Sequence, residues 1–204
     1  CAEIDRAISD LSGPQRRIRL LHCAQKGKAH ALNAGLAQVH TRYLVTVDAD
    51  TLLDVNAVDH IIRRLHYSKA ACVAGNLLVQ NARNLIQKMQ IYDYLISIAA
   101  IKRFQGSYGA TLVAQGAFSA YETDAVRQAG GWEQCAGEDI ALTYRLLAQG
   151  RHSLYESSAV GYTEVPQTFK RLCSQRIRWA RGMFDGLHAV PPWKQQSFFG
   201  GYFE

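Results

Sequence analysis

The stretch Tyr43-Leu-Val-Thr-Val-Asp48-Ala-Asp50 decides the expected fold, because an apolar, β-branched run ends abruptly in two carboxylates. Such a run is typical of a buried strand. In open α/β sheets, ligands bind at the carboxyl ends of the strands, which is where Asp48 and Asp50 would lie. Two carboxylates at this spacing can hold Mg²⁺ or Mn²⁺ while the ion keeps sites for water and diphosphate oxygens. The alternative is a simple turn in which Asp50 or Thr51 caps the next helix.

Strand-like and helix-like segments alternate on both sides of this stretch. The further expected strands cover residues 17–22, 71–79, 111–115, 118–122, 152–155 and 160–163, and the expected helices cover residues 2–11, 28–39, 55–67, 84–103, 138–149 and 167–188. Alternation of this kind predicts an α/β domain with a mostly parallel sheet flanked by helices. No internal repeat or low-complexity linker interrupts the chain, so one domain is expected.

The composition is that of a globular protein with an anionic partner. Of the 204 residues, 48% are hydrophobic and 20% are charged, which excludes a disordered tail. The five cysteines are dispersed without a Cys-x-x-Cys pair, which favours a reducing compartment and argues against a metal-thiolate site. The net charge of +6 suits nucleic acid, an anionic membrane face or a phosphorylated ligand.

Neither a membrane span nor a signal peptide is visible in the sequence. The most apolar candidate, residues 91–101, is too short to cross a bilayer and carries Asp93. The chain opens on Cys1 and closes on an aromatic stretch at residues 197–203, so both ends are expected to be cut.

Two short motifs at predicted helix starts can carry chemistry. Gly27-Lys28 would place an ammonium at a helix N-terminus, a combination that suits phosphate, although the Walker spacing is absent. The alternative is a solvated lysine. Gly137-Glu138-Asp139 opens a later helix, where acids are favoured by the helix dipole alone. The functional alternative is a general base, which would take the proton of a sugar hydroxyl.

The third motif lies on the long basic helix near the end of the chain. Gln175, Arg178 and Trp179 are spaced i, i+3 and i+4, so they share one helix face. Arg178 offers a planar donor fork for a diphosphate, and Trp179 offers an apolar plate for a sugar ring. The alternative is an amphipathic helix whose tryptophan is anchored in the core.

The order of these motifs resembles that of the processive family-2 glycosyltransferases, which include cellulose, chitin-oligosaccharide, hyaluronan and poly-N-acetylglucosamine synthases. The resemblance extends to the stretches at 26–35, 115–118, 164–168 and 179–182, and it covers roughly residues 1–190. It implies a GT-A-type fold and an inverting transfer from a UDP-sugar to the growing end of a β-linked polysaccharide.

The resemblance implies a donor site built from five residues. Lys28 would face the nucleotide, and Asp48 would contact the uridine and ribose side of the donor. Asp50 would ligate Mg²⁺ or Mn²⁺ bridging the diphosphate. Gln175 and Arg178 would close over that diphosphate.

The resemblance also implies the acceptor side. Asp139 matches the catalytic base, Glu138 is its acidic neighbour, and Trp179 lies at the acceptor. Gly137 before these acids, together with Glu164-Val165-Pro166, resembles the enzymes that build amino-sugar polymers. The expected donor is therefore UDP-N-acetylglucosamine.

The family begins with strands that hold the uracil, and this chain starts after them. Residues 1–190 are therefore expected to form a catalytic domain incomplete at its N-terminus, with residues 191–204 as the approach to a membrane segment. We also expect either a hole beside strand 43–47 or pairing of segment 17–22 against it. The expected location is the bacterial inner membrane, with the catalytic domain facing the cytoplasm.

Two rival functions share some of these features. One is a non-processive family-2 transferase that acts on a lipid or exopolysaccharide acceptor, against which the Gln-x-x-Arg-Trp element argues. The other is a nucleic-acid-binding module built on the basic helix from Lys170 to Arg181. That helix lacks an interleaved RNA-binding signature, so no nucleic-acid partner is expected.

Overall fold

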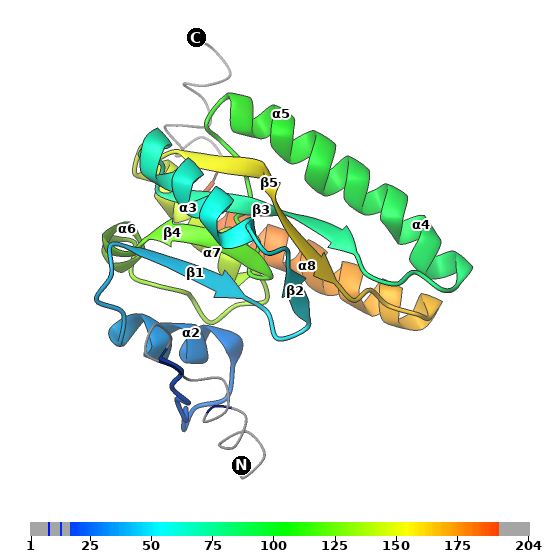
Figure 1. The fold of residues 1–204 in the computed structure, drawn as a ribbon, viewed down its shortest axis with the longest axis horizontal. Coiled ribbons are helices and arrows are strands. Elements are labelled where there is room, and N and C mark those ends of the chain that lie inside the picture. The colour runs from blue at the N-terminus through cyan, green and yellow to red at the C-terminus, as the bar shows by residue number, and fades with distance from the viewer. Residues whose placement is uncertain (1–7, 9–12, 14–16, 192–204) are drawn as a thin grey trace.

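The computed structural model describes residue 8, residue 13 and residues 17–191. Its centre is a five-stranded sheet in the order β1-β4-β3-β5-β2 (Figure 1). The strands are β1 (Tyr43–Val47), β2 (Thr51–Leu53), β3 (Cys72–Val79), β4 (Phe118–Glu122) and β5 (Ser153–Thr163).

The sheet is mixed, and the prediction of mostly parallel strands is wrong for the described residues. Only β3 and β5 pair in parallel, whereas β1–β4, β3–β4 and β2–β5 are antiparallel. The alternation of helices and strands does not fix strand direction. Here β4 returns beside β3 after a long helical excursion, and β2 follows β1 after a turn of three residues, 48–50.

Helices flank this sheet, so the predicted α/β arrangement is confirmed. They are α2 (Lys28–Ala37), α3 (Ala57–Ser68), α4 (Leu85–Tyr94), the π-helix η1 (Leu95–Ala100), α5 (Ile101–Ser107), α6 (Thr123–Gln128), α7 (Glu138–Ala148) and α8 (Phe169–Ala189). The expected helices at 28–39, 55–67, 84–103, 138–149 and 167–188 are confirmed with small shifts at their ends. The helix expected at 2–11 lies outside the described residues, apart from Ile8.

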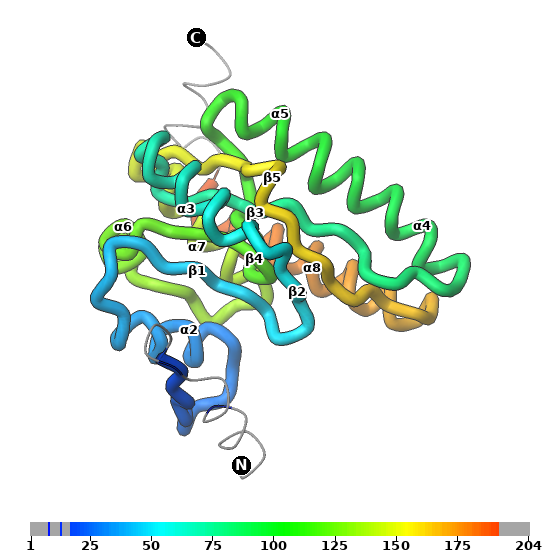
Figure 2. Tube along the Cα trace, in the orientation of Figure 1, coloured from blue at the N-terminus to red at the C-terminus, as the bar shows by residue number. Residues whose placement is uncertain are grey.

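Alternating side chains of the strands build two cores, one on each face of the sheet. On one face, Val73 of β3 and Phe118 of β4 pack with Ile61 of α3. On the other face, Cys72 of β3 and Tyr121 of β4 pack with residues of α2, α6 and α7. The helices therefore form layers on both sides of the sheet, and the chain path through them can be followed in Figure 2.

Two predicted strands are absent. Residues 17–22 form no strand and are mostly exposed, because an extended segment becomes a strand only when a neighbouring edge pairs with its backbone. Among the described residues β1 pairs with β4 alone, so its other edge has no strand beside it. Residues 111–115 also form no strand, because side chains rather than a neighbouring strand bind several of their backbone groups.

Three other details differ from expectation. The segments expected as separate strands at 152–155 and 160–163 form one strand, β5, whose register against β3 shifts between Ala74 and Asn76. The short elements β2 and α6 were not predicted.

Within the described part of the chain, no helix has the length and apolar character needed to cross a membrane.

Candidate active site

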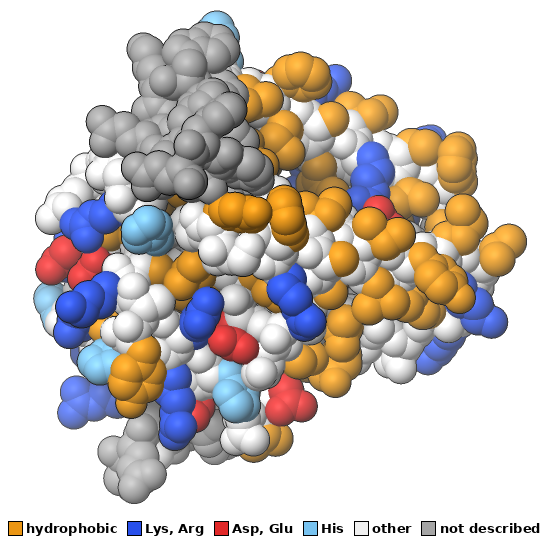
Figure 3. All heavy atoms as spheres, turned by 90° about the horizontal axis from the view of Figure 1, so that it is seen from above, with side chains coloured by type: hydrophobic (Ala, Val, Ile, Leu, Met, Phe, Trp, Pro, Cys, Tyr) orange, Lys and Arg blue, Asp and Glu red, His pale blue; other side chains and the backbone are white. Residues whose placement is uncertain are grey.

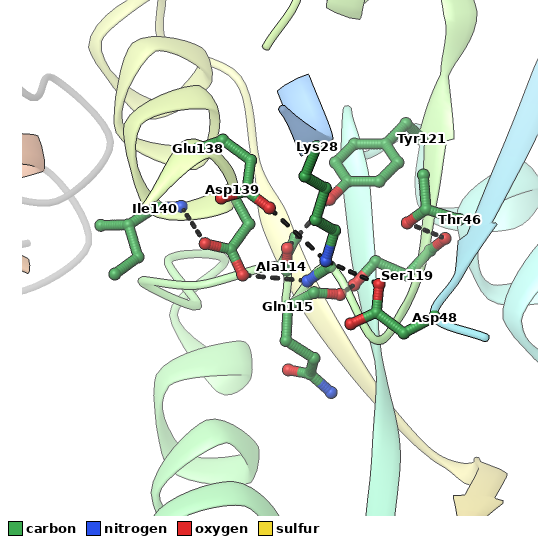
Figure 4. A network of polar contacts seen from close by, with 11 residues as sticks. Lys28, Thr46, Asp48, Ala114, Gln115, Ser119, Tyr121, Glu138, Asp139 and Ile140 are labelled. Carbon is green, nitrogen blue, oxygen red and sulfur yellow. Dashed lines mark hydrogen bonds and ion pairs between the residues drawn. The ribbon is translucent and has the colours of Figure 1, made fainter. Parts of the chain in front are cut away.

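Lys28 lies at the centre of a polar cluster that three separate elements build (Figure 4). It is the first residue of α2, and its Nζ lies 2.6 Å from Oδ1 of Asp48 and 3.5 Å from Oε1 of Glu138. Asp48 directly follows β1, and its backbone N–H donates to the carbonyl of Ala117 at 3.1 Å. Glu138 is the first residue of α7. The fold thus joins residues that are 20 to 110 positions apart in the chain.

The charges of this cluster are coupled. Burial lowers the pKa of Lys28, but the hydrogen bond to Asp48 and the charges of Asp48, Glu138 and Asp139 outweigh it, so the pKa is raised. Burial, followed by the charge of Asp139, raises the pKa of Glu138, and Lys28 opposes that shift. One ammonium therefore faces three carboxyl groups. An anionic diphosphate would be favoured here only together with a cation.

Asp139 is held in one orientation by backbone donors on both of its oxygens. The N–H of Gly116 donates to Oδ2 at 2.9 Å, and the N–H of Ile140 donates to Oδ1 at 2.9 Å. The residue also lies in the first turn of α7, where the helix dipole favours a negative charge. A carboxylate held in one orientation could serve as a general base for a hydroxyl that comes within hydrogen-bond reach.

Gly116 leaves room for the end of the Lys28 side chain. A Cβ at this position would lie 2.7 Å from Nζ of Lys28. The absence of a side chain lets the lysine extend past the turn at 115–118 to reach Asp48. The sequence marked residues 115–118 as typical of the family, but it gave no role for the glycine.

Asp50 lies apart from this cluster, exposed in the turn between β1 and β2. The charge of Asp50 acts on Tyr94 of α4. Burial is the main cause that raises the pKa of Tyr94; Arg176 lowers this pKa, and Asp93 and Asp50 raise it. Within the described residues, no group of three or more His, Cys, Asp or Glu side chains is arranged to hold a metal ion. Mg²⁺ and Mn²⁺ often bind through one or two carboxylates together with substrate phosphates, so the donor set at Asp50 fits an ion brought with the diphosphate.

The three predicted residues of α8 differ in their exposure. Gln175 is half-buried, and its side-chain oxygen has no hydrogen-bond partner among the described residues. Arg178 is exposed. Trp179 is 38% exposed, so its interpretation as a core anchor is wrong. Because the amphipathic helix buries glycines rather than this tryptophan, the indole remains available to a ligand.

A second group of residues fixes the tryptophan. The guanidinium of Arg176 lies over the Trp179 ring, 4.4 Å from its centroid. Arg176 in turn forms an ion pair with Asp93 of α4. One face of the indole is therefore occupied by a cation that is itself tied to a neighbouring helix.

The structure brings together some of the predicted site residues and separates others. Lys28, Asp48, Glu138 and Asp139 form one cluster, so Asp48, which was expected at the donor, shares a group of charges with Asp139, the expected base. Asp50, Gln175, Arg178 and Trp179 make no hydrogen bond or ion pair to that cluster among the described residues. Their roles at the donor and acceptor stay predictions.

Sequence reasoning missed several contributors. Thr143 accepts from the N–H of Ala114 and donates to the carbonyl of Asp139, at 3.0 and 2.7 Å. Arg176 supports Trp179, and Lys102 is buried near Asp139. The adjacent motif could have drawn attention to Arg176. Nothing in the local sequence distinguishes Thr143 or Lys102.

Comparison with known families and proteins gives a consistent picture. The family described as glycosyl transferase family group 2 matches residues 43–202. A poly-beta-1,6-N-acetyl-D-glucosamine synthase of Staphylococcus aureus is 36% identical over 164 residues, which is 79% of this chain and 40% of that protein. The protein of the same name from Staphylococcus epidermidis is 34% identical over the same shares. The chain thus spans about two fifths of the length of these curated relatives.

A solved structure confirms the fold. A mannosyltransferase from Pyrobaculum calidifontis, in complex with GDP-Man and Mn²⁺, superposes with a TM-score of 0.64 at 18% identity. The match covers 98% of this chain and 60% of that one. The predicted GT-A-type fold is therefore confirmed.

Proposed function

This chain belongs to glycosyl transferase family group 2, and on that basis we propose that the protein transfers N-acetylglucosamine from a UDP-sugar to the growing end of a β-linked polysaccharide. The transfer would invert the anomeric configuration of an α-linked donor. The observation that carries the proposal is the Asp139 carboxylate, fixed by two backbone N–H groups beside the cluster of Lys28, Asp48 and Glu138.

Asp139 is proposed to act on the acceptor. A hydroxyl of the polysaccharide end would donate its proton to the carboxylate as its oxygen attacks the anomeric carbon, and UDP would leave. Glu138, whose pKa burial and Asp139 raise, would contribute a hydrogen bond to the sugar. The exposed Trp179 ring would offer an apolar surface to the acceptor.

The donor is proposed to lie between the two groups of site residues. Lys28 would donate to the nucleotide diphosphate, exchanging part of its contact with Asp48 for a phosphate oxygen. Asp48 would be left to accept hydrogen bonds from the uridine and ribose. Arg178 and Gln175 would close over the diphosphate, and the unpaired oxygen of Gln175 supports a role toward a ligand donor.

A divalent ion, Mg²⁺ or Mn²⁺, is proposed to bind with the donor through Asp50. Such an ion would supply positive charge to the departing diphosphate. The excess of carboxyl groups around Lys28 supports this requirement, because a diphosphate with no accompanying cation would meet repulsion. The Mn²⁺ in the mannosyltransferase complex also supports it.

The choice of sugar rests on the names of the relatives and on the sequence pattern at residues 137–139 and 164–166. Both staphylococcal relatives are named for poly-β-1,6-N-acetylglucosamine synthesis. The alternative of a non-processive transferase acting on a lipid or exopolysaccharide acceptor would keep Asp139 as base. The Gln175-x-x-Arg178-Trp179 element argues against it.

We further propose that the protein works at the bacterial inner membrane, with this domain on the cytoplasmic side. Figure 3 shows hydrophobic side chains gathered over α4, η1 and α5. The exposed members of this patch are Leu85, Met89, Tyr92, Leu95, Ile96, Ile101, Phe104 and Tyr108. An apolar surface of this kind supports a position against lipid or a membrane-embedded part of the protein.

The test is a transfer assay with the full-length protein in membranes. Release of UDP would be measured from a panel of labelled UDP-sugars, with and without Mn²⁺, together with retention of label in polymer. The proposal expects Mn²⁺-dependent release from UDP-N-acetylglucosamine and long labelled products. Release from another UDP-sugar alone would overturn the sugar, and single additions to a lipid would favour the non-processive alternative.

A further inference from the structure

Lys102 is a buried cation in an unusual place. Of the residues of α5, Ile101–Ser107, it alone is buried, with 8% of its surface exposed. It directly follows Ile101, where the π-helix η1 gives way to α5. Short π-helical segments are often found at functional sites. Burying an ammonium is costly, so its contacts need an explanation.

The ammonium of Lys102 has a hydrogen bond but no ion-pair partner within the described part of the chain. Its Nζ donates to the carbonyl of Val113 at 2.7 Å. The titratable groups whose charge acts on its pKa are Asp139 of α7 and Cys72 of β3. Burial raises the pKa of Cys72 to about 12, so that thiol is neutral at physiological pH. Asp139 is therefore the anion toward which the charge of Lys102 acts.

Side chains hold the segment Val113–Gly116 between Lys102 and Asp139. Lys102 binds the carbonyl of Val113, Thr143 binds the N–H of Ala114, and the hydroxyl of Tyr121 donates to the carbonyl of Ala114 at 2.9 Å. The segment ends at Gly116, whose N–H donates to Asp139. Lys102 is therefore connected to the Asp139 carboxylate through the backbone from Val113 to Gly116.

We propose that Lys102 is a positioning residue for the transfer reaction: its buried ammonium holds the Val113–Gly116 segment in place and thereby fixes the orientation of the Asp139 carboxylate. This inference rests on the proposed role of Asp139 as base. It adds a residue that touches neither donor nor acceptor and acts through the backbone of Gly116.

A purely structural role would not require a charge at this position. Methionine has a similar length, fills a buried site without the cost of desolvating an ion, and would leave the packing of α5 intact. A lysine at the one buried position of α5 is therefore better explained by the carbonyl that its ammonium binds and by the charge of Asp139 that acts on it.

The charge state of Lys102 should make the positioning of Asp139, and with it kcat, depend on pH. Burial lowers the pKa of Lys102 to about 7, against the raising effects of Asp139 and then Cys72. As pH rises through this value the side chain loses its charge. A neutral amine still donates to Val113, but it no longer attracts the carboxylate of Asp139. Positioning by charge is thus strongest below pH 7 and weakens above it.

The experiment compares three variants of the full-length protein in membranes: Lys102→Met, Lys102→Arg and Lys88→Met. Lys88 is an exposed lysine on α4 and provides the matched control. Rates of UDP release would be measured from pH 6 to pH 9, with kcat and KM separated, alongside UDP affinity and thermal unfolding.

Lys102→Met should fold and bind UDP like the wild type, while kcat falls on the order of 10- to 100-fold, the range expected for a misplaced catalytic group. Its kcat should also lose the decline that the wild type shows above pH 7. Lys102→Arg, which stays charged, should recover part of kcat and show no such decline. Lys88→Met should match the wild type.

Two results would overturn the inference while leaving the proposed function intact. One is a Lys102→Met enzyme with wild-type kcat and pH profile. The other is a variant whose UDP affinity, stability and kcat fall together, since that would mean that Lys102 only supports the fold. A wild-type protein that releases no UDP from any UDP-sugar would remove the proposed function and this inference together.

Discussion

Gly137 and Gly182 meet backbone to backbone, so that a Cβ on Gly182 would lie 2.7 Å from the Cα of Gly137. The contact joins the start of α7, which carries Glu138 and Asp139, to the middle of α8, which carries Gln175, Arg178 and Trp179. One turn further along α8, a Cβ on Gly186 would lie 2.8 Å from a methyl carbon of Ile140. The position of α8 relative to the proposed base therefore depends on three glycines, Gly137 at the start of α7 and Gly182 and Gly186 of α8.

Gly182→Ala should push α8 away from α7, because the methyl group would overlap backbone atoms of Gly137. Overpacking of this kind costs about 1–3 kcal/mol of stability. Transfer should fall with it. The control is Gly35→Ala in α2, where a Cβ would meet nothing within 4 Å and stability should be kept or raised. Equal melting temperatures for the two variants would contradict the prediction.

Asp139→Asn should abolish most transfer and leave UDP binding nearly intact, because the amide can still accept from Gly116 but cannot take a proton. The loss expected for a general base is about 10²- to 10⁴-fold in kcat. UDP affinity by calorimetry and turnover by UDP release are the two measurements. The exposed Asp124→Asn serves as control. An Asp139→Asn enzyme that keeps more than roughly a tenth of the wild-type turnover would contradict the assignment of Asp139 as general base.

Arg178→Lys should severely reduce polymer yield at saturating donor although the charge is kept. Lysine presents a point charge, whereas the guanidinium offers the two-pronged geometry that a diphosphate matches. The control is Arg171→Lys, an exposed arginine on the same helix, which should have no effect. An unchanged yield in Arg178→Lys would mean that this residue belongs only to a solvated basic face.

Asp50→Asn should raise the Mn²⁺ concentration needed for half-maximal UDP release, because the amide is a weaker ligand than a carboxylate. Chelation of divalent ions should stop release by the wild type, and Mn²⁺ should restore it. The corresponding substitution at Asp54, a nearby exposed acid, should leave the Mn²⁺ requirement unchanged. A wild-type protein fully active in chelator would refute the metal assignment.

The stability of the wild type should depend on pH through Lys102. Its folded pKa of about 7 lies below the unfolded value of 10.5, so the unfolded state binds more protons between these values. The cost of burying the ammonium, on the order of several kcal/mol, is present in full below pH 7 and is relieved as pH rises toward 10.5. Lys102→Met lacks this cost. Its gain in melting temperature over the wild type should be larger at pH 6 than at pH 9, and a constant difference would argue against a buried charge.

The sequence determined the identity of most elements and of the motifs. Apolar runs and helix periodicity located β1, β3 and β4 and the helices from α2 to α8, except for α6, because these patterns reflect burial of one face. The order of Gly27-Lys28, Asp48-x-Asp50, Glu138-Asp139 and Gln175-x-x-Arg178-Trp179 was sufficient to indicate the family, which comparison then confirmed. Each of these motifs is local, so it can be read without knowing what lies beside it.

Only the tertiary structure decided what each motif contacts. Strand direction depends on pairing between distant segments, so the mixed sheet was not visible in the alternation of elements. The expected strand at 111–115 is instead a segment bound by Lys102, Thr143 and Tyr121, which come from three other elements. The meeting of Gly137 with Gly182 depends equally on how two helices pack. Local sequence records which residues prefer to be buried or charged, whereas hydrogen bonds and close contacts between distant residues exist only once the chain has folded.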